Sequence, residues 1–190
     1  MKRPHHGLML GATLAGIIIA LCLVNAGGRN ESAAAHAKSA EHHFRMYTIW
    51  MILQEPEAAL SELTKSIEED PGNAMYYSHR AGQYMDLHDY KSAISDSTRA
   101  INLNASRADF FAQRANCHYR LKEYESAARD LSDAIRLSGD NGIYWYQRYL
   151  VYEAAGKHDL AEADRASARQ RGVLEADFLT PKELFAQSRQ

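Results

Sequence analysis

A motif that recurs every 34 residues constrains the fold of this chain more than any other feature. The three copies read Tyr77-Ser78-His79-Arg80-Ala81, Phe111-Ala112-Gln113-Arg114-Ala115 and Trp145-Tyr146-Gln147-Arg148-Tyr149. A matching second half follows each copy at the same spacing. Because a single globular core imposes no fixed period, this repetition is typical of a solenoid built from similar units.

Each unit carries two apolar stretches at helical spacing. In one unit, Tyr77, Ala81 and Tyr84 mark the first stretch, and Ala93 and Ala100 mark the second. The few polar or small residues between the two stretches allow only a tight turn. Alanines recur where two helices would cross, and such crossings require small side chains. The sequence therefore predicts an all-α chain with two short antiparallel helices per unit.

These residues resemble the tetratricopeptide repeat (TPR) family, whose pattern has an aromatic opening, small residues at the helix crossing, a mid-repeat aromatic and a closing Pro. A weaker fourth copy lies upstream, where Asp70-Pro71 supplies the closing Pro, whereas Ala105 and Gly139 replace it in later copies. The resemblance implies a TPR-type α-solenoid of three clear repeats and one degenerate repeat. It covers residues 40–175, with repeats at about 40–73, 74–107, 108–141 and 142–175.

Residues 1–26 are predicted to be a signal anchor or a signal peptide. Lys2 and Arg3 precede an uncharged apolar run over residues 7–24, which is near the lower length limit for a membrane span. An uncleaved single-pass anchor is favoured, with a cytoplasmic N-terminus and extracytoplasmic or periplasmic repeats. Cleavage after the small residue Ala26 would instead give a secreted or periplasmic protein. An organelle protein with cytosol-facing repeats is the remaining alternative.

The segments that flank the repeats have their own signatures. Residues 27–39 are rich in Gly, Asn, Ser and Ala and are predicted to be a linker. Residues 176–190 are predicted to hold a C-terminal capping helix, because Thr180-Pro181-Lys182-Glu183 combines an N-cap, a Pro in the first turn and a capping-box Glu. The nearby apolar residues would cover the last repeat or dock a partner or second copy. They are Phe178, Leu179, Leu184 and Phe185.

One pair of opposite charges recurs with the repeat. Arg80, Arg114 and Arg148 each lie sixteen residues before an aspartate; the three partners are Asp96, Asp130 and Asp164. These positions face each other across a helical hairpin, so we expect structural salt bridges. An active site would not be copied three times, and replacement of Arg114 by Ala should therefore destabilise the protein without removing an activity. The degenerate copy has Met46 and Glu62 instead.

Composition and motifs exclude several classes of function. The formal net charge is −2 and no basic stripe interrupts the repeats, so nucleic-acid binding is not expected. No catalytic motif or phosphate-binding glycine loop is present, which predicts a protein that is not an enzyme and needs no cofactor. The nine histidines are scattered and predict no metal site. Cys22 and Cys117 lie in different parts of the chain and predict no intrachain disulfide.

Positions that differ between the repeats are the candidates for recognition, because the shared positions are explained by packing. On the first helices they form a second face that resembles the peptide-binding groove of the family. The predicted partner-binding residues are Ser78, His79, Gln113, Asn116, Tyr119, Arg120, Tyr146 and Gln147. The clamp that other members use for acidic C-termini is absent, since its positions hold Phe44, Thr48, His79, Asp109 and Gln113.

The sequence thus predicts a membrane-anchored adaptor that binds a protein or peptide partner, for example during assembly of an envelope or secretion complex. The competing hypothesis is a structural protein that associates with further copies of itself through the irregular first repeat or the apolar C-terminal residues. The oligomeric state in solution separates the two.

Overall fold

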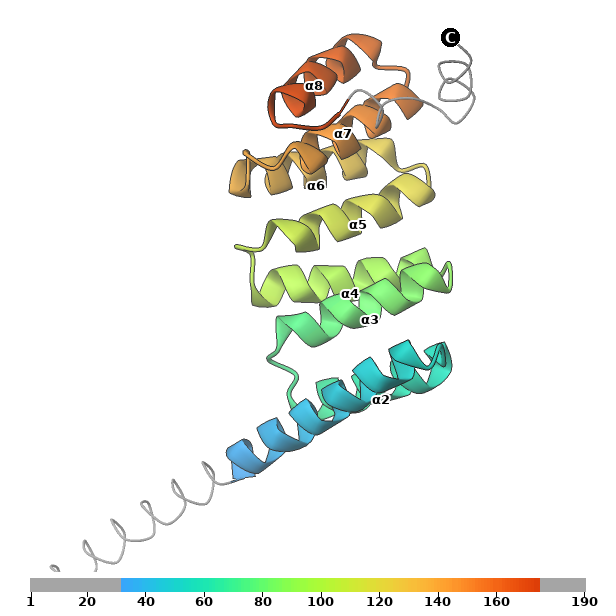
Figure 1. The fold of residues 1–190 in the computed structure, drawn as a ribbon, viewed down its shortest axis with the longest axis vertical. Helices are drawn as coiled ribbons and strands as arrows, with labels where there is room; N and C mark the ends of the chain where they lie inside the picture. Colours follow the sequence, from blue (N-terminus) through green and yellow to red (C-terminus); the bar gives the residue numbers. More distant parts are fainter. Residues whose placement is uncertain (1–31, 175–190) are drawn as a thin grey trace, which may run out of the picture.

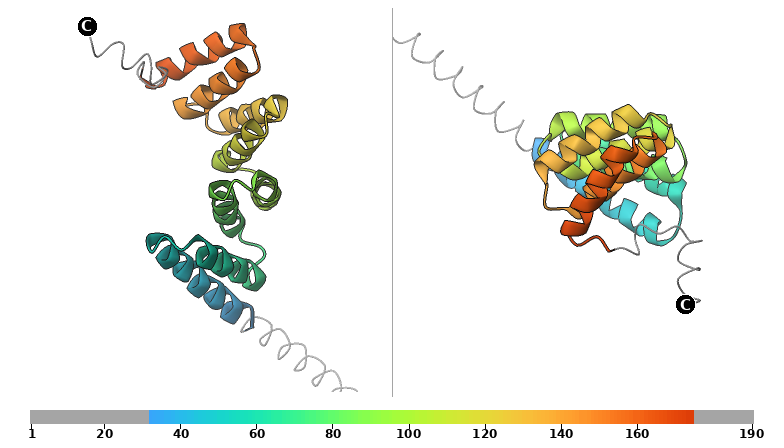
Figure 2. Two further views of the ribbon diagram at one scale, coloured as in Figure 1. Left: turned by 90° about the vertical axis from the view of Figure 1, so that its right-hand side faces the viewer. Right: turned by 90° about the horizontal axis from the view of Figure 1, so that it is seen from above.

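The computed structural model describes residues 32–174 of the 190 in the chain, and this part is helical with no strand. Its helices stack in chain order along one long axis (Figure 1). They are a helix over residues 32–52, α2 (Pro56–Glu69), α3 (Ala74–Asp86), α4 (Tyr90–Leu103), α5 (Ala108–Arg120), α6 (Tyr124–Leu137), α7 (Gly142–Ala154) and α8 (His158–Gln170). Figure 2 shows that successive hairpins are turned relative to one another, as in a solenoid.

The turn inside each hairpin has the same backbone geometry at a 34-residue interval. Gln54, His88, Lys122 and Gly156 occupy equivalent positions, and each has a positive φ between 60° and 71°. The next residue donates its N–H back to the last turn of the preceding helix, as in Asp89 N to Tyr84 O at 2.8 Å. This left-handed residue closes the helix C-terminus and reverses the chain.

The recurring alanines lie where the two helices of a hairpin cross. Ala81 and Ala93 are fully buried in one hairpin, and Ala115 and Ala127 are buried in the next. Phe110 and Leu131 belong to a buried cluster that extends from Ala40 of the first helix to Val151 of α7, and two smaller clusters contain Leu63 and Ala81. The core therefore runs along the stack and does not sit at a single centre, as expected for a repeat protein.

The first helix is longer than the sequence predicts. Helix is present from residue 32, although the linker was expected to continue to residue 39. The run Ala33-Ala34-Ala35 accounts for the difference, because alanine has the highest helix propensity.

Two of the predicted segments lie outside the described residues. They are the signal anchor or signal peptide at 1–26 and the C-terminal helix at 176–190. Among the helices of residues 32–174, none combines the length and apolar character needed to span a bilayer.

Candidate functional site

The arginine of each of the three clear repeats binds two helices besides its own. The guanidinium of Arg114 donates to both carboxylate oxygens of Asp130 at 2.7 and 2.8 Å. Its third nitrogen donates to the hydroxyl of Thr98 at 3.0 Å, on the second helix of the preceding repeat. The hydrogen bond with Asp130 raises the pKa of Arg114, and the guanidinium also lies 6.0 Å from the Phe111 ring centroid. One side chain thus closes a hairpin and ties it to its neighbour.

The same geometry recurs in the other two clear repeats. Arg80 and Arg148 bind both oxygens of Asp96 and Asp164 at 2.7 to 2.9 Å. The hydroxyls, which the sequence reasoning missed, are Thr64, Thr98 and Ser132. They lie sixteen residues before each arginine at the 34-residue period, so the period itself was the signal that could have identified them. We call each set of arginine, aspartate and hydroxyl a staple.

In the degenerate first repeat, Met46 stands at the arginine position, and His43, about one helical turn earlier, bonds to the acidic residue instead. His43 Nδ1 lies 2.6 Å from Glu62, at the position equivalent to the staple aspartates, and His36 contacts Glu69 on the same helix pair. Burial raises the pKa of Glu62, but hydrogen bonds from Lys65 and His43 and their charges outweigh that effect, so its pKa lies below the ordinary value. This hairpin therefore has a polar link of different chemistry.

Three junctions between first helices form the face that the sequence predicts to bind a partner. At the first junction, His79 packs between the rings of Phe44 and Tyr47, with ring centroids 5.0 and 5.6 Å away. The Tyr47 hydroxyl lies 3.5 Å from His79 Nδ1. Burial lowers the pKa of His79, so the neutral ring is favoured there. Aromatic side chains fill this junction.

The second junction is closed by a pair of hydrogen bonds. The Gln113 amide accepts from the Ser78 hydroxyl and donates to the Ser78 carbonyl oxygen, both at 3.0 Å. Ser78, His79 and Gln113, all predicted to bind a partner, therefore make contacts within the solenoid itself.

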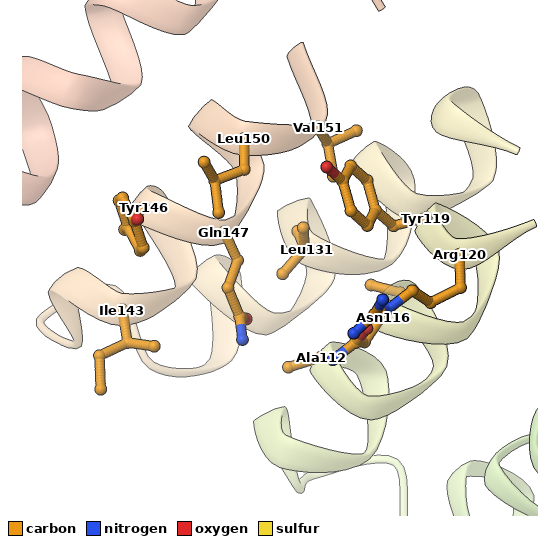
Figure 3. Close-up of a pocket in the computed structure, with 11 residues that line it drawn as sticks. Ala112, Asn116, Tyr119, Arg120, Leu131, Ile143, Tyr146, Gln147, Leu150 and Val151 are labelled. Atoms are coloured by element: carbon orange, nitrogen blue, oxygen red, sulfur yellow. The ribbon is translucent and has the colours of Figure 1, made fainter. Parts of the chain in front are cut away.

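The third junction, between α5 and α7, is open. A hollow of about 320 Å³ lies between the two helices, with Leu131 of α6 at its floor (Figure 3). Five predicted residues line this α5–α7 groove, together with apolar side chains that the prediction left out. The lining is Ala112, Ala115, Asn116, Tyr119, Arg120, Leu131, Ile143, Tyr146, Gln147, Leu150 and Val151.

A single substitution between repeats accounts for an unpaired atom in the groove. Gln147 is equivalent to Gln113, but Ala112 stands where the second junction has Ser78. The hydroxyl that Gln113 accepts from is therefore missing, and Gln147 Oε1 is buried without a hydrogen-bond partner. A buried acceptor left in this state costs free energy.

The groove is apolar at its floor and polar at its rim. Ile143 and Leu150 are large apolar side chains left exposed, at 56% and 37% of their surface. The rim carries the exposed amide of Asn116 and the exposed guanidinium of Arg120, and the lining contains no acidic residue. This arrangement can bind an apolar group and a hydrogen-bonding or anionic group together. Within residues 32–174, no group of histidine, cysteine or acidic side chains is arranged to hold a metal ion.

Comparison with known proteins places the fold. No family model matches the chain. The Protein SGT1 homolog of Bos taurus is 41% identical over 61 residues, which are 29% of this chain and 18% of that protein. The human Protein SGT1 homolog is 40% identical over 50 residues, or 26% of this chain and 14% of that one. The chain thus spans less than a fifth of the length of these curated relatives.

Solved structures cover more of the chain at lower identity. A crystal structure of MamA has a TM-score of 0.67 at 21% identity over 78% of this chain and 82% of that one. The Arabidopsis OM64 TPR domain has a TM-score of 0.59 at 20% identity, over 62% and 98% of the two chains. The first TPR of Spaghetti (RPAP3), bound to the HSP90 peptide SRMEEVD, has a TM-score of 0.54 at 22% identity, over 68% and 95%. The described part of the chain therefore has the TPR fold.

Proposed function

We propose that this protein is a membrane-anchored TPR adaptor that binds a protein or peptide partner in the α5–α7 groove and has no catalytic activity. The observation that carries the proposal is the open, apolar hollow at this junction, whereas the other two junctions are filled by their own side chains. Support by analogy comes from the RPAP3 domain, whose structure contains a bound peptide.

The proposed location follows from the sequence. The apolar run over residues 7–24 would hold the chain in a membrane, and Lys2 and Arg3 would keep the N-terminus cytoplasmic. The groove would then face an extracytoplasmic or periplasmic space, where an envelope or secretion complex is assembled. If the segment is cleaved, the same domain acts as a secreted or periplasmic protein.

Photocrosslinking in native membranes tests the groove directly. A photoreactive phenylalanine analogue at Tyr146 should capture a partner, because this side chain lines the hollow. The matched control carries the analogue at Lys91, an exposed residue that does not line the hollow. Equal capture from both positions, or capture from Lys91 alone, would remove the groove from consideration.

Exposed apolar residues of the first hairpin favour self-association as a second candidate function. Ile52, the last residue of the first helix, and Leu53, the next residue, expose 81% and 57% of their surface. A second copy could cover them. Light scattering of the full chain in detergent should show a stable oligomer that dissociates on replacement of both residues by serine, whereas a monomer at all concentrations excludes this function.

A further inference from the structure

We propose that the α5–α7 groove binds an extended segment that places one apolar side chain in the hollow and a carboxylate against Arg120. This inference rests on the proposed function and specifies the chemistry of the partner. Three properties of the groove carry it: the size and apolarity of the hollow, the state of Arg120 and the state of Gln147.

The hollow fits an anchoring side chain. Its volume of about 320 Å³ is at the lower end of the range for ligand pockets. The floor and sides are aliphatic, formed by Leu131, Leu150 and Val151, with Tyr119 and Tyr146 at the edges. Burial of a Leu or Phe side chain there removes apolar surface of both partners from water.

Arg120 supplies the charge preference. Its guanidinium is exposed, and none of the salt bridges within residues 32–174 involves it. The nearby carboxylate of Glu123 is held by His118 at 2.6 Å. Since the lining holds no acidic residue, the groove favours an anion near Arg120. A carboxylate binds guanidinium through charge-assisted hydrogen bonds.

Gln147 supplies the preference for an extended backbone. Its buried Oε1 has no partner in the free protein and its side chain lines the hollow, so a bound segment that reaches this oxygen with an N–H would satisfy it. Backbone N–H groups inside a helix are already used, whereas an extended segment leaves alternate N–H groups free. Gln113 provides an internal contrast, because Ser78 already satisfies its amide oxygen.

Labelled peptides and the full chain in detergent provide the test. The probes are nine-residue Gly/Ser peptides with a central Leu, followed two residues later by Glu, Gln or Lys, and anisotropy reports binding. The Glu peptide should bind about tenfold more tightly than the Lys peptide. The variant Arg120→Glu should reverse the order. The control Lys91→Glu makes the same charge change outside the groove lining and should leave the order unchanged. Equal binding of the three peptides, or no binding, overturns the inference.

Substitution of the glutamines tests the backbone contact. Gln147→Leu should weaken binding of the Glu peptide severalfold without lowering Tm, because the lost oxygen has no intramolecular partner. Gln113→Leu should lower Tm, because it removes two hydrogen bonds to Ser78. Unchanged binding in Gln147→Leu would contradict the assigned contact.

A third variant separates failure of the inference from failure of the proposed function. Ile143→Asp places a charge at the groove and should abolish binding of every peptide that uses it. If all peptides bind equally but Ile143→Asp abolishes binding, the groove remains the site and only the charge preference is wrong. If binding persists in Ile143→Asp, the peptides bind elsewhere and both proposals fail.

Discussion

The staple arginines are the residues on which the stack depends most. The Arg114 side chain is 20% exposed and that of Asp130 is 8% exposed, so removal of the arginine leaves a largely buried carboxylate without its partner. Arg114→Ala should therefore lower the free energy of unfolding by about 2–3 kcal/mol in urea denaturation. Arg107→Ala, which breaks an exposed pair with Asp109, is the control and should have little effect. Similar losses in both variants would contradict the staple.

Ser97 is a core residue whose hydroxyl makes no hydrogen bond. It is fully buried on α4, and its Oγ has no hydrogen-bond partner. The equivalent positions in the neighbouring repeats hold the buried Leu63 and Leu131. Ser97→Ala should stabilise the protein by about 1 kcal/mol, because it removes an unsatisfied buried hydroxyl. The control Ser66→Ala removes a hydroxyl that donates to Glu62 O at 3.0 Å and should not stabilise it. Thermal unfolding of both variants measures the difference.

At the residue scale, the sequence predicts those contacts that the 34-residue period alone determines. The spacing of sixteen residues between arginine and aspartate predicts the pairs that the structure contains. It could not predict that Ser78 and Gln113 bind each other, because that contact depends on the distance between neighbouring repeats. For the same reason, the sequence could not predict that the side-chain oxygen of Gln147 lacks a hydrogen-bond partner.

At the scale of elements, the last hairpin turn has glycine at the left-handed position, whereas the other three turns have a residue with a side chain. Gly156 has φ 71°, and Lys122 holds φ 62° at the equivalent position. Because a side chain disfavours the left-handed region, Lys122→Gly should stabilise the fold by about 0.5–1 kcal/mol and Gly156→Ala should destabilise it by about 1 kcal/mol. Chemical denaturation of the two variants tests the pair, and changes of the same sign would contradict the argument.

The junction between the first helix and α3 should be sensitive to pH through His79. Because burial lowers its pKa from 6.5, the unfolded chain takes up the proton first as the pH falls. The stability that neutral His79 contributes is therefore complete above about pH 6.5 and is lost on acidification. Between pH 7.5 and 5.5, thermal unfolding should show a larger loss for the natural protein than for His79→Gln. His36 and His43 are common to both proteins, and equal losses would exclude a role for His79.

The positions of most helices could be predicted from the sequence, but the start of the first helix and the turn conformations could not. The helices α3 to α8 lie within the predicted repeats, because their apolar spacing and turns recur. The sequence predicts that the linker ends at residue 39, but the first helix begins at residue 32. No repeat pattern marks that end of the helix, and only helix propensity determines where it begins. A left-handed residue was not predictable in the turns of Gln54, His88 and Lys122, since glycine occurs only at Gly156.

At the scale of the whole molecule, stability should vary along the stack. Repeat proteins unfold by units that contact only their neighbours, and the first hairpin is the described unit without a staple arginine. Amides of residues 32–52 and α2 should therefore exchange with deuterium faster than those of α5 and α6, which lie between two stapled junctions. Uniform protection across residues 32–174 would show instead that the domain opens as one unit.

The position of the staple hydroxyl has a consequence for how such a chain can change in length. Each staple arginine binds an aspartate of its own unit and a hydroxyl of the unit before it, and the two middle repeats, 74–107 and 108–141, carry both the arginine and the hydroxyl. A second copy of residues 74–107, inserted after the first, would meet complementary partners at both of its ends. Duplication of this unit would therefore lengthen the spacer between the first helix and the groove by one repeat with its staples intact.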